Sequence, residues 1–169
     1  RWEKKVNSVY PLYLGNMGFV RGLGSVLNTD VSDLGLSFSQ LLGSKMLLGS
    51  AEIRLPFTGP KKLAVIPSSF LLTDLNLFVD SGVTFDKISD WSDGKPIDVV
   101  QRDEAGNIIL DNSGNPVYRL EVAKPTVVTS IGVSLRLNLF GALILEPYYA
   151  RPLLDGGRFR FGINFIPGW

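Results

Sequence analysis

The feature that most constrains the fold is a strict alternation of residue types between Thr126 and Phe140. Odd-numbered positions there carry valine, threonine, isoleucine and leucine, whereas even-numbered positions are mostly small or polar. A period of two predicts a β-strand with one apolar and one polar face. A strand of about 14 residues exceeds the 5 or 6 that are usual in globular proteins, and it suits a tilted crossing of a bilayer.

The same alternation recurs four more times, so five strands of an all-β fold are predicted. Their ranges are about 45–57, 73–86, 126–140, 143–153 and 158–169. The apolar faces are expected to be free of charge, and the polar faces carry Glu52, Arg54, Asp80, Arg136, Glu146, Arg158 and Arg160. A soluble β-sandwich has the same alternation with its charges facing water. Strand length and the ten phenylalanines favour the strands of a transmembrane antiparallel β-barrel.

The connections between these strands differ in length, as in outer-membrane barrels, which have short turns at one end and long loops at the other. Residues 140–143 and 153–158 predict short connections, and residues 87–125 predict a long external loop. A long irregular segment, about 11–44, precedes the first strand. The connection 57–73 contains the apolar sequence LAVIPSSFLL, which predicts a segment at the membrane interface.

Inside the long loop, the sequence DEAGN at 103–107 recurs as DNSGN at 111–115. Glycine beside asparagine suits turns that need a positive φ angle, so the repeat predicts a β-hairpin standing above the barrel. A calcium site is the other interpretation, although no full calcium-loop pattern is present. Its ligands would be Asp103, Asp111 and Asn112.

Composition removes most chemistry from consideration. The chain has no cysteine and no histidine, which excludes thiolate chemistry and the commonest general base and metal ligand. A net charge of +1 gives no field that would recruit nucleic acid. The sequence contains no run of about 18 apolar residues, so no transmembrane helix is predicted. No secretion signal opens this sequence. No cofactor is expected, and a soluble enzyme using Glu52 and Asp80 as an acid–base pair is the weakest of the functional alternatives.

Five segments in a fixed order carry a family resemblance. They are VRG at 20–22, SAEIRLPF at 50–57, LFVDSGVTFD at 77–86, SIGVSLRLNLFGALILEPYYARPL at 130–153 and RFRFGINFIPGW at 158–169. From about Gly18 to Trp169 the chain resembles the C-terminal part of the BamA-like outer-membrane assembly barrels, the bacterial surface antigen family. Two departures are visible: Leu23 replaces the aromatic residue that usually follows the motif, and Pro167-Gly168 precedes the final tryptophan.

The resemblance implies that the segment of about 11–44 folds back into the barrel lumen, with Val20, Arg21 and Gly22 at its tip. It also implies that acidic residues on the following strands hold Arg21, at positions that match Glu52 and Asp80. This pairing is physically reasonable, because a buried guanidinium must be paired and its planar fork suits carboxylates. The alternative is that Arg21 contacts solvent or phosphate in an external loop.

The resemblance gives the last strand a role as well. In related barrels this strand forms a weak seam with the first strand, and an opened seam can template an incoming strand. The implied residues are Phe159, Phe161, Gly162, Phe165 and Trp169. The simpler alternative is that this strand is only the signal by which the barrel itself was inserted.

Two functions follow from the resemblance. The first is a bacterial outer-membrane barrel that inserts or transports client proteins by strand templating, with outer-membrane lipid, lipopolysaccharide, and client or accessory proteins as partners. The second is a plugged structural barrel that anchors a soluble N-terminal module within a larger outer-membrane complex. Five strands cannot close a barrel. The remaining strands are therefore expected from the same longer polypeptide or from another chain.

Overall fold

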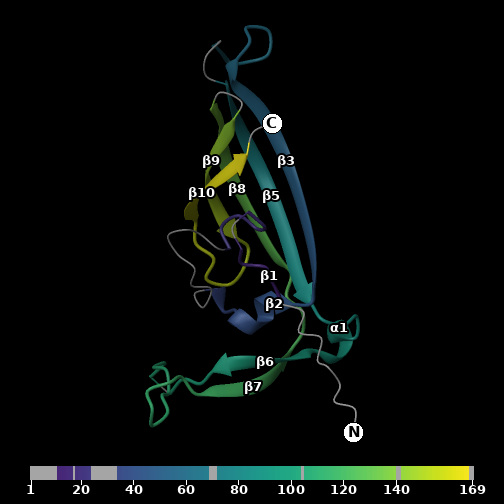
Figure 1. The fold of residues 1–169 in the computed structure, drawn as a ribbon, viewed down its shortest axis with the longest axis vertical. Coiled ribbons are helices and arrows are strands. Elements are labelled where there is room, and N and C mark those ends of the chain that lie inside the picture. Colours follow the sequence, from purple (N-terminus) through teal and green to yellow (C-terminus); the bar gives the residue numbers. More distant parts are fainter. Residues whose placement is uncertain are drawn as a thin grey trace.

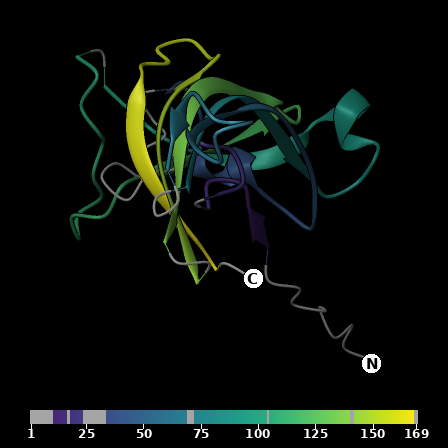
Figure 2. The same ribbon diagram turned by 90° about the horizontal axis from the view of Figure 1, so that it is seen from above.

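The computed structural model describes residues 11–16, 18–23, 34–68, 72–103, 105–139 and 142–167. The largest element is one antiparallel sheet with a short parallel strand at one edge. Its strands are β3 (Lys45–Gly59), β4 (Ile66–Pro67), β5 (Leu72–Phe85), β8 (Val128–Leu139), β9 (Leu143–Pro152) and β10 (Arg160–Pro167). The spatial order is β10-β9-β8-β5-β3-β4, and the sheet curls into a half-barrel (Figures 1 and 2).

Each of the five predicted strands overlaps one long strand of this sheet. The two-residue strand β4 was not predicted; it pairs with the end of β3, Thr58 opposite Ile66 and Gly59 opposite Pro67. The last strand begins at Arg160, two residues later than the predicted start at 158, and the structure describes it to Pro167. The final Trp169, and the turn at Phe140 and Gly141, lie outside the described residues.

The strand registers decide which side chains share a face. Across all four interfaces between the long strands, even-numbered residues pair with even-numbered ones, as in Ser50–Asp80, Asp80–Ser130 and Ser130–Pro152. The exception is the end of β3, where a register shift pairs Thr58 with Thr73. Side chains alternate along a strand, so the polar even-numbered positions form the concave face. The odd-numbered positions form a convex face rich in exposed apolar side chains: Leu47, Ile53, Leu55, Leu75, Leu77, Val79, Ile131, Val133, Tyr149, Phe161 and Phe165.

The convex face departs from the prediction near two strand ends, since Lys45 at the start of β3 lies opposite Phe85 on this face. Arg151 lies opposite Ile131, on the face that was expected to carry no charge. It sits near the end of β9, and its Nε atom donates a hydrogen bond to the Gly157 carbonyl at 3.1 Å in the loop that follows. The alternation was correct there, but the charge-free description does not extend to the end of the strand.

The described residues before β3, namely 11–16, 18–23 and 34–44, lie inside the curve of the sheet (Figures 1 and 2). The base of this segment is a small sheet of β1 (Leu12–Tyr13) and β2 (Leu42–Gly43), next to a 3₁₀ helix at Phe38–Leu41. Buried apolar side chains from this segment pack together with Val128 of β8. They are Leu14, Val20, Leu23, Leu34, Leu36 and Leu41.

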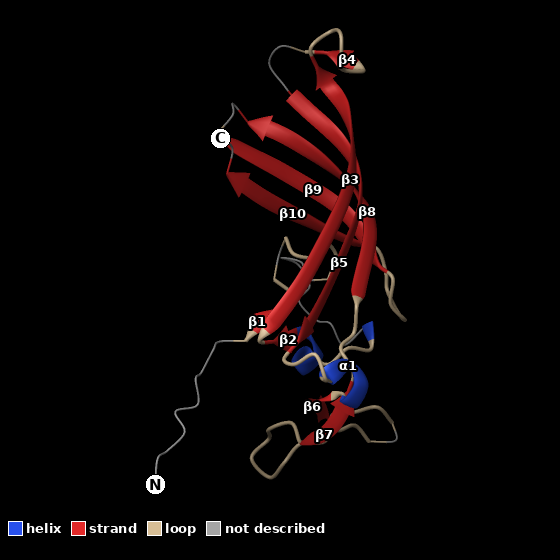
Figure 3. Ribbon diagram, turned by 90° about the vertical axis from the view of Figure 1, so that its right-hand side faces the viewer, coloured by secondary structure: helices blue, strands red, loops and turns tan. Residues whose placement is uncertain are grey.

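The long loop after β5 contains a one-turn helix α1 (Asp90–Asp93) and a hairpin of β6 (Lys95–Val100) and β7 (Tyr118–Ala123). The hairpin projects beyond one end of the half-barrel, while β4 lies at the opposite end (Figure 3). Lys95 holds its base, because its ammonium group donates to the Leu42 carbonyl. Within the described ranges, no helix is long and apolar enough to cross a membrane.

Candidate functional site

The tip of the in-folded segment rests directly on the concave face. Gly22 has a φ angle of 87°, and a Cβ atom there would lie 2.9 Å from the Ala150 Cβ on β9. Glycine is therefore required both for the backbone conformation and for the close approach. A second glycine makes room on β5, since a Cβ on Gly82 would come within 2.5 Å of Leu14 and 3.0 Å of Val20. A glycine on the loop and a glycine on the sheet therefore both make this contact possible.

Arg21 is the centre of the site, with its side chain only 6% exposed. Its Nε and Nη2 atoms donate to the two carboxylate oxygens of Asp80 at 2.7 and 2.8 Å, a bidentate pair. Nη2 also lies 2.8 Å from Glu52 Oε1, and Nη1 donates to Glu146 Oε1 at 3.0 Å. The Arg21 backbone N–H adds a bond to Asp80 at 3.1 Å. One guanidinium thus ties the loop to three strands, β3, β5 and β9.

Neighbouring side chains fix the carboxylates in place. Ser50 donates to Asp80 at 2.7 Å and Ser134 donates to Glu146 at 2.8 Å. Asn164 of β10 donates to the other Glu146 oxygen at 3.3 Å, which brings the terminal strand into the network. Two further guanidiniums lie at the edge of the cluster: Arg54 pairs with Glu52 at 2.8 Å, and Arg136 approaches Glu52 and Glu146 at 3.7 and 3.9 Å. Three guanidiniums therefore face three carboxylates, and the cluster is close to neutral.

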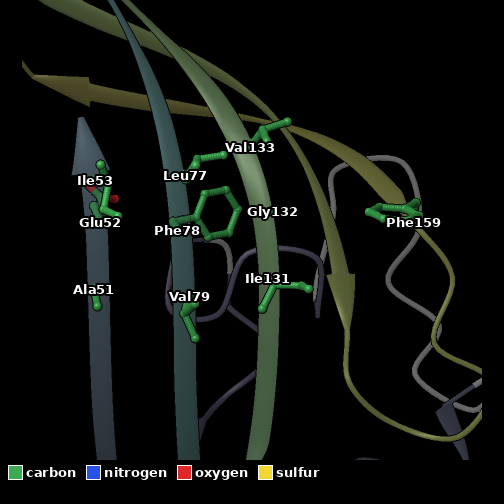
Figure 4. A pocket seen from close by; sticks show the side chains of 10 residues that line it. All are labelled: Ala51, Glu52, Ile53, Leu77, Phe78, Val79, Ile131, Gly132, Val133 and Phe159. Atoms are coloured by element: carbon green, nitrogen blue, oxygen red, sulfur yellow. The ribbon is translucent and has the colours of Figure 1, made fainter. Parts of the chain in front are cut away.

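An aromatic ring completes the arginine site. The Arg21 Cζ atom lies 3.5 Å from the centroid of the Phe78 ring, a cation–π contact. Phe78 meets Tyr148 edge to face at 6.4 Å between centroids. Space for this ring exists because a Cβ on Gly132 would lie 2.6 Å from Phe78 Cζ. Figure 4 shows the Phe78 ring beside Gly132.

The sequence prediction located most but not all of this site. Arg21 contacts both Glu52 and Asp80, as the resemblance implied, and it lies on the concave face and not in an external loop. Glu146 was missed as the third partner, although the alternation had placed it on the polar face. The stacking on Phe78 was also missed, because an apolar residue at a polar-face position gives no signal in a pattern of period two.

The terminal-strand residues form a different surface. Phe159 stacks on Tyr149 at 4.9 Å between ring centroids, and Phe161 and Phe165 are exposed on the convex face. Gly162 faces inward, and a Cβ there would lie 2.3 Å from the Tyr148 ring. This glycine therefore lets Tyr148 cross the concave side of β10, a packing role that the sequence did not reveal. A second contact to the loop comes from Arg160, which donates to the Leu23 carbonyl at 3.1 Å.

The convex face carries a shallow apolar groove across β3, β5 and β8 (Figure 4). Outward-facing side chains form most of its lining: Ala51, Ile53, Leu77, Val79, Ile131 and Val133, with Phe159 at one end. The groove contains no outward-facing charge, so it suits apolar chains better than a polar ligand.

The repeated sequences of the long loop form two similar turns. The Asp103 carboxylate accepts hydrogen bonds from the backbone N–H groups of Ala105 and Asn107, at 2.9 and 2.8 Å. Asp111 repeats the arrangement eight residues later, accepting from Ser113 and Asn115. Each aspartate thus serves its own turn. Among the residues that the structure describes, no group of three or more acidic side chains is placed to hold a metal ion.

We expect these two turns to loosen in acid. The side-chain hydrogen bond from Asn107 lowers the pKa of Asp103 below its ordinary 3.8, and the backbone N–H of Asn115 does the same for the pKa of Asp111. A lowered pKa stabilises the turn above pH 3.8, and this stabilisation is lost as the pH falls through the lowered pKa. Hydrogen exchange at Asn107 and Asn115, corrected for the intrinsic rate and followed from about pH 6 to about pH 2, measures the loss.

In this experiment, each turn serves as the experimental control for the other. Asp111→Asn should remove the pH dependence of protection at Asn115 and leave that at Asn107 unchanged, since each carboxylate bonds only within its own turn. An unchanged pH dependence of protection at Asn115 in the Asp111→Asn variant would contradict the assignment.

The arginine cluster is suited to holding structure. Glu52 and Asp80 are both ion-paired with Arg21, so neither carboxylate is free to act as a general base. What the cluster can do is fasten a loop inside a half-barrel through one cation and three strands. No protein-family model, no curated protein and no solved structure matches the chain, so a functional assignment has to rest on this geometry.

Proposed function

We propose that this chain contributes the C-terminal strands of a transmembrane β-barrel in the bacterial outer membrane, of the BamA-like assembly type. One observation carries the proposal: the Val20-Arg21-Gly22 tip rests on the concave face, and Arg21 is ion-paired with Glu52, Asp80 and Glu146. The family resemblance implied this loop position from the sequence alone. The apolar convex face supports a lipid-facing surface in contact with outer-membrane lipid and lipopolysaccharide.

The sheet edges support a barrel larger than this chain. Within the described residues, β10 pairs only with β9, and the other edge consists of β3 with the short β4. In a bilayer, each unpaired backbone group costs several kcal/mol, so an open sheet of this kind needs further strands. We propose that the same longer polypeptide, or another chain, supplies them.

The proposed mechanism is strand templating at the β10 edge. Within the described residues this strand has eight residues, whereas β3 has 15 and β5 has 14, so a partner on β10 is held by few backbone hydrogen bonds. A seam that opens readily exposes an edge on which an incoming client strand can pair. No covalent chemistry is needed for this function, and the partners are client proteins and accessory subunits.

Depletion of the full polypeptide in its host tests the proposal. An assembly barrel should lower the outer-membrane abundance of many unrelated β-barrel proteins, with their unfolded forms accumulating before insertion. Quantitative proteomics of purified outer membranes measures this effect. A photo-crosslinking amino acid at Ile163 on β10 should then capture client strands, whereas the same probe at Leu77, far from the sheet edge, should not.

The competing anchor function predicts a different result. A plugged structural barrel would be lost from the membrane together with its own soluble module, while other barrel proteins kept their normal abundance. That outcome, with no client captured at Ile163, would overturn the assembly proposal.

A further inference from the structure

The connection between β3 and β5 has a defined fold at the end of the half-barrel opposite the β6–β7 hairpin (Figure 3). The backbone N–H groups of Leu63 and Ala64 donate to the Pro60 carbonyl at 2.9 and 3.0 Å, which closes a tight turn. The chain then returns along β3, where Ser68 donates to the Gly59 carbonyl at 2.8 Å. The segment 60–68 is thus a folded projection, which we call the β4 loop.

The surface of the β4 loop combines two unlike kinds of side chain. Leu63, Val65 and Ile66 are 74%, 75% and 48% exposed, which places three large apolar side chains in solvent. Lys61 and Lys62 stand immediately beside them, and both are exposed. The sequence from Phe57 to Thr73 holds no acidic residue, so neither lysine has a carboxylate nearby in the chain. A surface of this kind suits a partner that presents apolar and anionic groups within a few ångströms of each other.

The position of the β4 loop identifies such a partner. The loop projects beyond the end of the sheet that is opposite the β6–β7 hairpin (Figure 3). Phe57 and Leu55, which precede it on β3, are 39% and 50% exposed and continue the apolar surface toward the convex face. From its interior toward water, a phospholipid leaflet presents acyl chains first and phosphate groups next. Lysine side chains reach phosphates from such a depth by extending along their apolar stems.

From the charge complementarity and this placement, we infer that the β4 loop is an anchor for anionic phospholipid. Leu63, Val65 and Ile66 enter the boundary between acyl chains and headgroups, and Lys61 and Lys62 bind the lipid phosphates. The inference rests on the proposed membrane placement of the half-barrel and adds a specific lipid class to it. By fastening the loop between β3 and β5, the anchor would set the depth of the sheet in that leaflet.

Fluorescence quenching in reconstituted vesicles tests this inference. The 169-residue chain has no cysteine, so Leu63→Cys in an otherwise cysteine-free full-length polypeptide gives one labelling site for an environment-sensitive dye. The vesicles contain phosphatidylcholine and phosphatidylglycerol, one of which carries a nitroxide near the headgroup. We expect quenching at position 63 to be stronger with nitroxide-labelled phosphatidylglycerol than with nitroxide-labelled phosphatidylcholine. The reason is that each lysine should enrich the anionic lipid beside the loop roughly fivefold. The double substitution Lys61→Glu and Lys62→Glu should remove that preference.

Two further labelling positions make the result decisive. Leu120→Cys is the matched control, since Leu120 is also 74% exposed but lies on β7 of the projecting hairpin, and its label should not be quenched. Leu77→Cys reports on the middle of the convex face and should be quenched by a nitroxide deep in the acyl chain. Quenching at position 77 without quenching at 63 would overturn the anchor alone. No quenching at either position would overturn the membrane placement as well.

Discussion

Replacing Arg21 with alanine should destabilise the folded half-barrel by about 3–5 kcal/mol, because it leaves buried carboxylates without their counter-charge. Asp80 and Glu146 are each 2% exposed, and the only other guanidinium near either of them among the described residues is that of Arg136, 3.9 Å from Glu146. The loop should also lose its fastening and become sensitive to protease near the Val20-Arg21-Gly22 tip. Denaturant unfolding, followed by the mobility shift between folded and unfolded barrel on gels, measures the loss.

A nearby arginine provides the control for this substitution. Arg54 also pairs with Glu52 at 2.8 Å, but its side chain is 54% exposed. Arg54→Ala should therefore cost only about 0–1 kcal/mol. Arg21→Lys should fall between the two, because a single ammonium group cannot reproduce the bidentate contact with Asp80. Equal effects of Arg21→Ala and Arg54→Ala would mean that the buried cluster does not hold the loop.

Local pattern predicts much of this architecture for a clear physical reason. Alternation along one strand is a property of neighbouring residues, and it is enough to assign Glu52, Asp80 and Glu146 to polar faces. Whether those faces coincide is a property of the registers, which depend on loop lengths and on distant contacts. The pairing of even-numbered residues across all four interfaces brings the three carboxylates together, and no single strand contains that information.

The features that escaped prediction depend on contacts between neighbouring strands or between the loop and the sheet. Gly82 and Gly132 read as weak points within strands, yet one makes room for Leu14 and the other for the Phe78 ring. The role of Gly162 beside Tyr148 is of the same kind. The β4 strand escaped because a two-residue parallel pairing leaves no periodic signal. In each case the missing information is a contact between segments, which the order of residue types along one strand does not encode.

Phe78→Ala should cost about 3–5 kcal/mol of folding free energy, the usual range for removing a buried phenylalanine. Phe78 is 3% exposed and contributes two distinct interactions, the packing against Tyr148 and the cation–π contact with Arg21. Phe78→Leu keeps most of the buried volume but removes the ring, so it should cost about 1–2 kcal/mol. Denaturant unfolding of each variant gives the two values.

A double-mutant cycle separates packing from the contact with the guanidinium. If the ring stabilises the charge of Arg21, Phe78→Leu should lose most of its cost in a chain that already carries Arg21→Ala, giving a coupling of about 0.5–2 kcal/mol. If Phe78 only fills space beside Gly132, its substitution should cost the same in both backgrounds. The first outcome would show that the Phe78 ring helps to hold the loop. A buried guanidinium has lost its water, and it is stabilised by an aromatic ring on a face that the carboxylates do not cover.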